Sequence, residues 1–376
     1  MRKINHFVII LIMLSNILHS QTPTKTYMYV GSFTANKPGD GIYVYEFNTD
    51  KGELNEVQKI GNIINPSYLT VSPNGKNLYA CTETQLERNG SVSAFKIDPK
   101  TGKITFLNKQ SAGGKNPVYV VVDSSNKYVF NGNYDDAGVC VFECNSDGSL
   151  NPLSELIEFE GNSIIQERQK EAHVHSVNLS TDSKYLFAPD LGADKIRVLT
   201  FDKDSLLTVS YDLEVSCKKG SGPRHFTFHP NNKFAYCVEE LSGTVSTYKY
   251  KNGQLDWIDS NFSYSKKQDT YGSADIHISP DGKFLYVSNR WIDENTITIF
   301  KINQSTGILN LVGHSSTFGN HPRNFVIDPT GKFLLVANQN SNSIIVLKRD
   351  MKTGVLTKTK TEINVKMPSC LKMIKY

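Results

Sequence analysis

Arginine, glutamate and histidine residues stand at positions of this sequence where a hairpin would bring them together. Residues 222–228 alternate in polarity, residues 229–232 form the turn signal His-Pro-Asn-Asn, and residues 233–240 run through Phe-Ala-Tyr-Cys-Val to two glutamates. Alternation on both sides of such a turn predicts an antiparallel hairpin. The start of its first strand and the end of its second strand then share one end of a sheet. We therefore expect Arg224 and Glu240 to be neighbours, although sixteen positions separate them.

The same unit recurs along the chain at a spacing of about fifty residues, which is the length of a four-stranded propeller blade. The lysine that follows each turn marks the repeat, and its copies are Lys76, Lys127, Lys184, Lys233, Lys283 and Lys332. Most copies continue into a third strand, such as 297–300, and a fourth, such as 308–311. Helical periodicity is confined to the short insert 165–170.

Six copies leave one strand pattern over at each end of the chain. Residues 367–374 match the first strand of a repeat, and residues 27–32 match the second. Together they complete a seventh repeat, and such closure removes the open sheet edges. The predicted fold is all-β, a seven-bladed β-propeller whose ring is closed by N- and C-terminal strands sharing one blade. We expect residues 21–376 to form this single domain.

Two columns of residues are predicted to surround one mouth of the axial channel. The position nine before the turn lysine is occupied by Ser67, Val118, His175, Arg224, Ala274, Arg323 and, at the C-terminus, Ser369. The position seven after it is occupied by Glu83, Tyr134, Leu191, Glu240, Arg290, Gln339 and, at the N-terminus, Phe33. Guanidinium groups outnumber carboxylates here, and arginine binds carboxylate or phosphate through two parallel hydrogen bonds. The pattern favours a site for an anionic small molecule.

Each of these signals also has a structural interpretation. A single arginine–glutamate pair between blades serves equally well as a structural ion pair. His173 and His175 share a strand face, but a His-x-His pair on a strand is more often a hydrogen-bonded core feature than a ligand set. A metal site would need further ligands, and none has the required spacing. No metal and no cofactor are predicted.

Several ordered motifs resemble the lactonase family of seven-bladed propellers, which includes propeller-type 6-phosphogluconolactonases and carboxymuconate cyclases. The motifs span the mature chain and comprise 168–169, 173–177, 189–194, Gly222-Pro223-Arg224-His225, Glu240-Leu241, Ser288-Asn289-Arg290, Pro322-Arg323-Asn324-Phe325 and Ala337-Asn338-Gln339. One departure is Glu239, where the family usually has asparagine before the glutamate.

The resemblance implies a metal-independent site made of a histidine, two arginines and a glutamate. These residues map onto His175, with His173 as the other candidate, Arg224, Glu240 and Arg290. The candidate substrate-binding residues are His173, His225, Arg323, Gln339 and Glu83.

The leading hypothesis is hydrolysis of a sugar-acid lactone or a related anionic lactone. Arg224 and Arg290 would hold the substrate and stabilise the oxyanion that develops on its carbonyl group. Either Glu240 or His175 would be the general base, and the other would protonate the leaving ring oxygen. Two alternatives stay open: a muconate-type lactonizing cycloisomerase and a ligand-binding propeller without catalysis.

The first twenty residues predict export. Arg2 and Lys3 precede the apolar run 7–14, and Ser20 is small, which is the order of a secretory signal peptide too short for a membrane anchor. Removing residues 1–20 lowers the net charge of the chain from +4 to +2, because Arg2 and Lys3 are the only charged residues in this segment. That charge is too small for a nucleic-acid reader. We expect a periplasmic or secreted monomer that does not bind the membrane after cleavage.

Cysteines in an exported chain suggest disulfides, but this chain is long enough to bury a core without them. Cys81, Cys217, Cys237 and Cys370 lie in apolar strand patterns, where cysteine behaves as a small hydrophobic residue. All six cysteines are therefore predicted to be free thiols.

Overall fold

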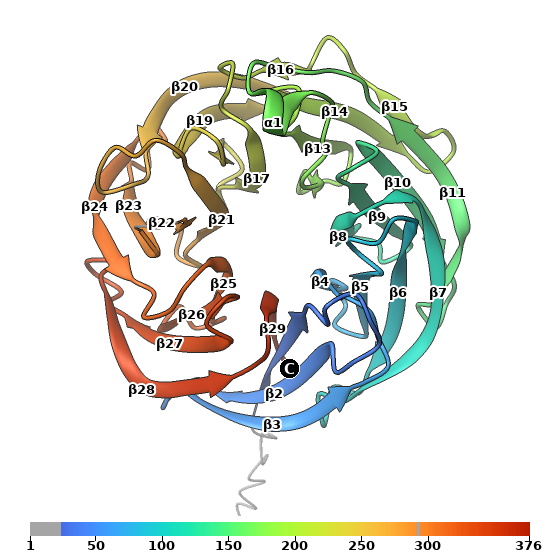
Figure 1. Cartoon of the computed structure of the whole chain (residues 1–376), viewed down its shortest axis with the longest axis vertical. Helices are drawn as coiled ribbons and strands as arrows, with labels where there is room; N and C mark the ends of the chain where they lie inside the picture. Colours follow the sequence, from blue (N-terminus) through green and yellow to red (C-terminus); the bar gives the residue numbers. More distant parts are fainter. Residues whose placement is uncertain (1–23, 292–293) are drawn as a thin grey trace, which may run out of the picture.

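The computed structural model describes residues 24–291 and 294–376, which form a ring of seven antiparallel sheets (Figure 1). Each sheet is one blade, with its first strand nearest the axis and its last strand on the outer edge. The seven-bladed propeller predicted from the repeat is confirmed. The predicted signal peptide, residues 1–20, lies outside the described residues.

The blades are numbered along the chain from the N-terminus. Blade 1 contains β29 (Pro368–Lys375), β1 (Thr26–Ser32), β2 (Ile42–Asn48) and β3 (Glu53–Ile60). Blade 2 contains β4 (Tyr68–Val71), β5 (Asn77–Thr82), β6 (Asn89–Ile97) and β7 (Ile104–Lys115). Blade 3 contains β8 (Pro117–Val122), β9 (Tyr128–Asn133), β10 (Gly138–Cys144) and β11 (Leu150–Glu158). Blade 4 contains β12 (Asn178–Leu179), β13 (Tyr185–Asp190), β14 (Lys195–Asp202), β15 (Leu206–Val209) and β16 (Val215–Ser216).

The remaining three blades each have four strands. Blade 5 contains β17 (Pro223–Phe228), β18 (Phe234–Glu239), β19 (Thr244–Lys251) and β20 (Gln254–Phe262). Blade 6 contains β21 (Gly272–Ile278), β22 (Phe284–Arg290), β23 (Thr296–Ile302) and β24 (Leu309–Ser316). Blade 7 contains β25 (Pro322–Ile327), β26 (Phe333–Asn338), β27 (Ser343–Arg349) and β28 (Leu356–Asn364).

Blade 1 closes the ring with strands from both ends of the chain. β29 pairs with β1 in antiparallel register, from Thr26 opposite Lys375 to Gly31 opposite Cys370. The backbone amide of Phe33 also donates to the carbonyl of Met367 at 3.1 Å. The predicted sharing of one blade by the two termini is therefore confirmed.

A repeated tyrosine–glycine contact joins neighbouring blades. A tyrosine hydroxyl on the second strand of one blade donates to a glycine carbonyl in the outer turn of the next blade. The pairs are Tyr29–Gly102 at 3.1 Å, Tyr79–Gly148 at 2.9 Å, Tyr236–Gly307 at 2.8 Å and Tyr286–Gly354 at 2.8 Å. These glycines have φ between +71° and +88°, a conformation that side chains with a Cβ rarely adopt. The contacts fix each blade against the next and so hold the inner strands around the axis.

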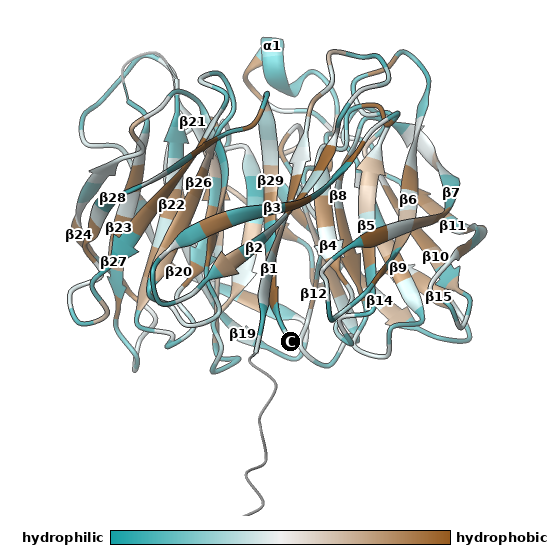
Figure 2. Ribbon diagram, turned by 90° about the horizontal axis from the view of Figure 1, so that it is seen from below, coloured by the Kyte–Doolittle hydropathy of each residue, from teal (hydrophilic) through white to brown (hydrophobic). Residues whose placement is uncertain are grey.

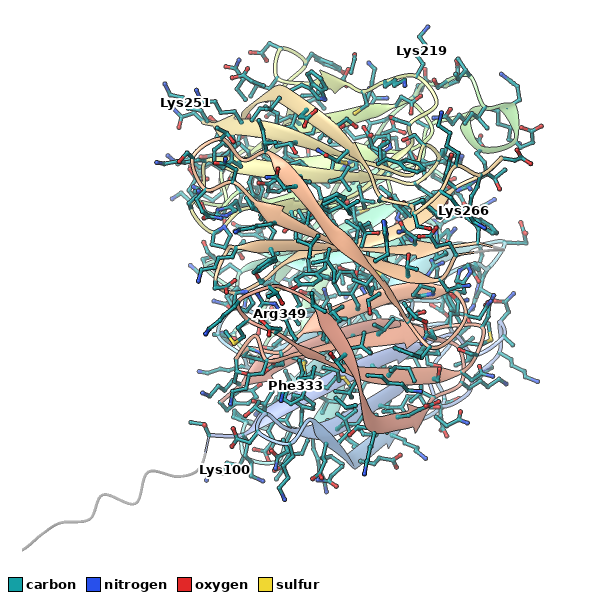
Figure 3. The ribbon with its side chains drawn as sticks, turned by 90° about the vertical axis from the view of Figure 1, so that its left-hand side faces the viewer. Lys100, Lys219, Lys251, Lys266, Phe333 and Arg349 are labelled. Atoms are coloured by element: carbon teal, nitrogen blue, oxygen red, sulfur yellow. The ribbon has the colours of Figure 1, made fainter. Side chains whose placement is uncertain are left out.

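Apolar residues are concentrated in the strands, where most of them are buried, and the loops at the two rims are mostly polar (Figure 2). Figure 3 shows Lys219, Lys251 and Lys266 at the outside of the molecule, whereas Phe333 and Arg349 lie among the sheets and are buried. The short helix α1 (Gln166–Gln169) stands on the rim opposite the C-terminus (Figure 2), where the sequence predicted a helical insert. All six cysteines are free thiols, as predicted.

No helix in the described part of the chain has the length and apolar character of a membrane span.

Candidate active site at the axial mouth

The predicted hairpin places Arg224 directly beside Glu240. β17 and β18 pair in antiparallel register, with a register shift at Arg224, between Pro223 and His225, and Arg224 lines the cavity at the mouth. Arg224 Nε donates to Glu240 Oε2 at 2.7 Å, and both residues are buried. The two residues are therefore neighbours at one mouth of the channel, as the sequence predicted.

Glu240 is the common partner of three arginines. Arg290 Nη2 lies 3.0 Å from Glu240 Oε2, and Arg168 Nη2, from α1, donates to Glu240 Oε1 at 2.8 Å. Burial alone would raise the pKa of this carboxyl group, but Arg290, Arg224 and Arg168 together hold it far below its usual range. Glu240 is therefore a permanently ionised anchor for the guanidinium groups, and both of its oxygens are occupied.

Arg224 is fixed by a second chain of hydrogen bonds on its other side. Its Nη1 lies 3.0 Å from His225 Nε2 and also donates to the carbonyl of Ala274. His225 Nδ1 lies 2.8 Å from Asp275 Oδ1. Burial, and then the Arg224 charge, lowers the pKa of His225 to about 3. The imidazole is therefore neutral, donating from Nδ1 to Asp275 and accepting from Arg224 at Nε2.

Arg323 lines the same cavity but has no hydrogen-bond or ion-pair partner among the described residues. Its guanidinium lies over the Phe33 ring, 5.2 Å from the ring centroid. Burial, and then the charges of Arg224 and Arg290, lowers its pKa to about 9, so it stays cationic at neutral pH. Arg290, by contrast, also donates from Nε to the carbonyl of Gly272 at 3.0 Å. Arg323 is thus the arginine best placed to receive an external anion.

His175 faces this cluster as a neutral base. Its Nδ1 is buried without a hydrogen-bond partner in the described structure. Burial lowers its pKa well below the usual value, and Arg224, His225 and Arg323 lower it further. The ring also packs edge-on against His225, with centroids 5.4 Å apart. Because Nδ1 is buried, a water bound in the cavity would meet the neutral ring at its other nitrogen, Nε2, which can accept a proton when Nδ1 carries the hydrogen.

His173, the other histidine candidate, lies outside the cavity lining. Its ring stacks on Tyr134 at 4.3 Å with an interplanar angle of 3°, and its Nδ1 lies 3.0 Å from the Tyr134 carbonyl. These contacts place it behind Tyr134, which itself lines the cavity. Of the two histidines, the structure places only His175 against the arginine cluster.

Three further candidates also lie apart from the cavity lining. Glu83 binds Arg88 at 2.9 Å and Lys109 at 3.1 Å on the rim of blade 2. The backbone amide of Gln339 donates a hydrogen bond to the carbonyl of His321. The side-chain oxygen of Gln339 is buried and has no hydrogen-bond partner in the described structure. His225 is covered by Arg224 and reaches the site through it.

The cavity has a volume of about 400 Å³. Besides His175, Arg224, Glu240, Arg290 and Arg323, its lining includes Arg168, Tyr134, Trp291, His321, Asn116, Val118 and Gln85. Arg168 is the main residue that sequence reasoning did not assign to the site. Its signal was the short helical insert before the third hairpin, which stands on the rim of the ring (Figure 2).

Four guanidinium groups and one carboxylate line this cavity. Burial, and then Arg290, lowers the pKa of His321 to about 3, so this histidine adds no charge at neutral pH. The site therefore carries an excess of positive charge and is complementary to an anion. Within residues 24–291 and 294–376, no group of three or more His, Cys, Asp or Glu side chains is arranged to hold a metal ion.

Comparison with known proteins identifies the family. Residues 27–373 match the family described as "Lactonase, 7-bladed beta-propeller". The chain belongs to this lactonase family. Among its relatives is a 6-phosphogluconolactonase of Formosa agariphila, 48% identical over 93% of this chain and 99% of the relative. A second, from Bacillus subtilis, is 36% identical over 93% and 99% of the two chains and has the same name.

Solved structures of similar chains share the lactonase fold closely. A periplasmic gluconolactonase of Pseudomonas aeruginosa superposes with a TM-score of 0.87 at 32% identity, covering 93% of this chain and 99% of that one. A protein from Bacteroides fragilis described as a "putative 6-phosphogluconolactonase" gives a TM-score of 0.88 at 38% identity, covering 94% of this chain and 99% of that one. The family resemblance inferred from the ordered motifs is thus confirmed.

Proposed function

We propose that this protein hydrolyses the lactone of an anionic sugar acid at the axial mouth, and that His175 is its general base. The observation that supports this most directly is that some polar groups of the site already have protein partners, whereas others have none. Glu240 is saturated by three arginines, whereas His175 is neutral and unpartnered and Arg323 has no carboxylate partner. Membership of the lactonase family and the names of its relatives support the same reaction class.

The reaction begins when His175 takes a proton from water as the water oxygen attacks the lactone carbonyl carbon. The carbonyl oxygen becomes an oxyanion, and the positive field of Arg224 and Arg290 stabilises it. As the ring C–O bond breaks, the leaving alkoxide takes the proton back from His175. One water is consumed, the product is an open-chain hydroxy acid, and the imidazole is neutral again.

Arg323 supplies the contact that selects an anionic substrate. Its guanidinium can form two parallel hydrogen bonds to a carboxylate or phosphate group, because no protein oxygen occupies it. Arg224 and Arg290 are already directed by Glu240 and by backbone carbonyls. They therefore keep one position during turnover, which is what preorganised stabilisation of an oxyanion requires.

We also propose export, because the order of charges, apolar residues and small residues in the first twenty positions is that of a signal peptide. A relative is described as a periplasmic gluconolactonase, which fits this compartment. Phosphorylated sugar lactones are cytosolic, so an unphosphorylated sugar-acid lactone fits an exported enzyme better. We expect the enzyme to act as a monomer.

The test is acid release at constant pH from a panel that includes 6-phosphogluconolactone, gluconolactone, an aldarolactone that carries a free carboxylate, and a neutral lactone. The proposal predicts turnover of at least one sugar-acid lactone, with ¹⁸O from the solvent in the product carboxylate. Muconolactone and its open-chain diacid serve as the comparison pair. Interconversion of that pair without solvent oxygen would instead establish the cycloisomerase, and binding of these compounds without turnover would establish a binding protein.

A further inference from the structure

A polar side chain on the second or third strand ties most blades to the preceding blade. Three of these ties are asparagine side chains that donate to a carbonyl at the end of the preceding outer strand: Asn133 to Ala112 at 2.8 Å, Asn289 to Ser263 at 2.8 Å and Asn338 to Thr317 at 3.0 Å. In blade 1, the Ser32 hydroxyl donates to the carbonyl of Lys366. In blade 4, Arg197, held by Asp190, donates to the carbonyl of Glu160 at 2.7 Å.

Blade 5 has Glu239 where blades 3, 6 and 7 have asparagine, and a carboxylate cannot donate to a carbonyl. Glu239 instead accepts hydrogen bonds from Ser246, at 2.9 Å, and from Thr244, both in its own blade. A cavity of about 660 Å³ lies at this joint, between β16 of blade 4 and β19 and β20 of blade 5. Blade 2 resembles blade 5 in this respect. Thr82, at the equivalent position, forms hydrogen bonds with Ser91 and Ser93 of its own blade, and it lines a cavity of about 360 Å³.

The face of blade 5 that lines the larger cavity is rich in hydroxyl groups. Ser246 lies opposite Ser260 in the β19–β20 register, and Tyr248 lies opposite Trp257. Ser216 completes the lining from blade 4. Trp257 also lines the cavity and is 62% exposed as a residue, an unusual state for tryptophan. The cavity therefore combines an aromatic surface with several hydrogen-bonding groups.

The two charged residues that line this cavity, Glu239 and Lys218, have opposite charges, so the cavity has no net charge to attract an anion or a cation. A ligand rich in hydroxyl groups can donate to the Glu239 carboxylate and exchange hydrogen bonds with the serines. The C–H face of a pyranose ring fits the indole of Trp257, because an aromatic ring offers an apolar surface with a negative face. The volume lies within the range of small-molecule sites and exceeds that of one sugar ring.

We propose that the cavity between blades 4 and 5 binds a neutral saccharide through Trp257, Glu239 and the surrounding hydroxyl groups. This site is separate from the axial cavity, which shares none of its lining residues. It would hold the enzyme on a carbohydrate while the axial site acts on a lactone. The inference does not depend on the identity of the reaction at the axial mouth.

The two tryptophans of the chain allow a direct test, because Trp257 lines this cavity and Trp291 lines the axial one. A Trp291→Phe variant keeps only the indole of Trp257, and a Trp257→Phe variant keeps only that of Trp291. Each is titrated with methyl α-D-glucopyranoside, methyl α-D-mannopyranoside, methyl β-D-galactopyranoside and maltose while tryptophan fluorescence is recorded. None of these probes contains a lactone. Sodium gluconate and choline chloride serve as anionic and cationic controls.

We expect at least one neutral sugar to change the fluorescence of the Trp291→Phe protein and not that of the Trp257→Phe protein. By calorimetry, Trp257→Ala should weaken binding of that sugar about tenfold or more. Glu239→Gln should weaken it as well, whereas lactone hydrolysis by the Trp257→Ala protein stays unchanged. The proposal is overturned if no neutral sugar binds, if Trp257→Ala binds as tightly as the wild type, or if gluconate or choline binds this cavity in preference to the sugars.

Discussion

Arg224 and Glu240 stand sixteen positions apart in sequence, and a hydrogen bond of 2.7 Å from Nε to Oε2 joins them at the axial mouth. The same carboxylate oxygen lies 3.0 Å from Arg290 Nη2, and the other oxygen accepts from Arg168. A single carboxylate therefore organises three guanidinium groups contributed by α1, blade 5 and blade 6. This arrangement makes Glu240 a scaffold for the arginines, and in the proposed mechanism His175 rather than Glu240 transfers the proton.

Replacing Glu240 by glutamine should damage both folding and activity. The change leaves Arg168, Arg224 and Arg290 without their shared counter-charge, and breaking such buried pairs typically costs about 3–5 kcal/mol. Urea denaturation of the variant measures the loss in the free energy of unfolding. Glu83→Gln is the matched control, because Glu83 pairs with lysine and arginine on the rim, where ion pairs contribute about 0–1 kcal/mol. Equal stability of the two variants would contradict the scaffold role.

Removing the guanidinium of Arg323 should impair binding of anionic substrates selectively. Arg323→Ala leaves the hydrogen bonds around Glu240 intact, since Arg323 does not contribute to them. Loss of a charge-assisted hydrogen bond is expected to raise KM for an anionic lactone roughly tenfold to a hundredfold. The control is a neutral lactone assayed with the same variant, for which KM should change little. A parallel rise in both KM values would show that Arg323 does not select for charge.

Because of the buried histidines, we expect the free energy of unfolding to decrease as the pH falls below about 6.5. Burial lowers the pKa of His225 and His321 to about 3 and that of His175 well below its usual value. Between pH 6.5 and pH 3 the unfolded chain therefore binds protons that the folded chain excludes, so the free energy of unfolding rises with pH. Each such histidine contributes up to about 1.4 kcal/mol per pH unit.

Urea titrations at pH 7, 6 and 5 measure this dependence. Glu240 and Asp275 add to it at lower pH, because their depressed pKa values give stability that is lost as the pH falls through the carboxylate range. A His225→Gln variant should show a shallower slope between pH 6 and 5, since it lacks one titrating group. A free energy of unfolding that stays level or increases from pH 7 to pH 5 would contradict the neutral state of these histidines.

The blade repeat and the position of the charged residues could be predicted because both follow from strand periodicity. A turn lysine recurs in six copies, and hairpin geometry then brings Arg224 next to Glu240 without further information. The closing blade could be predicted in the same way, because 27–32 and 367–374 each matched one strand of the repeat. Both relations follow from the arrangement of the strands, and the alternation of apolar and polar residues makes strands the clearest feature of this sequence.

The roles of individual side chains could not be predicted, because they depend on local backbone departures. His173 and His175 both pack against Tyr134, yet only His175 lines the cavity. The chain there makes only an isolated bridge at Val174, and regular strand begins at Asn178. Glu83 has a φ of +57°, which breaks the strand geometry that its column position assumed. Arg168 reaches Glu240 from a four-residue helix on the rim. The sequence predicted this helical insert, but the insert lies outside the blade repeat, so no repeat position placed Arg168 near Glu240.

The central claim is tested most directly by the turnover number of His175→Gln, measured by acid release at constant pH on the best sugar-acid lactone. Loss of a general base is expected to lower kcat by about 10²–10⁴-fold, with the fold and the KM retained. His173→Gln carries the same chemical change two positions away, behind Tyr134, and should keep kcat within about tenfold of the wild type. Wild-type turnover in His175→Gln, or an equal loss in both variants, would contradict the account.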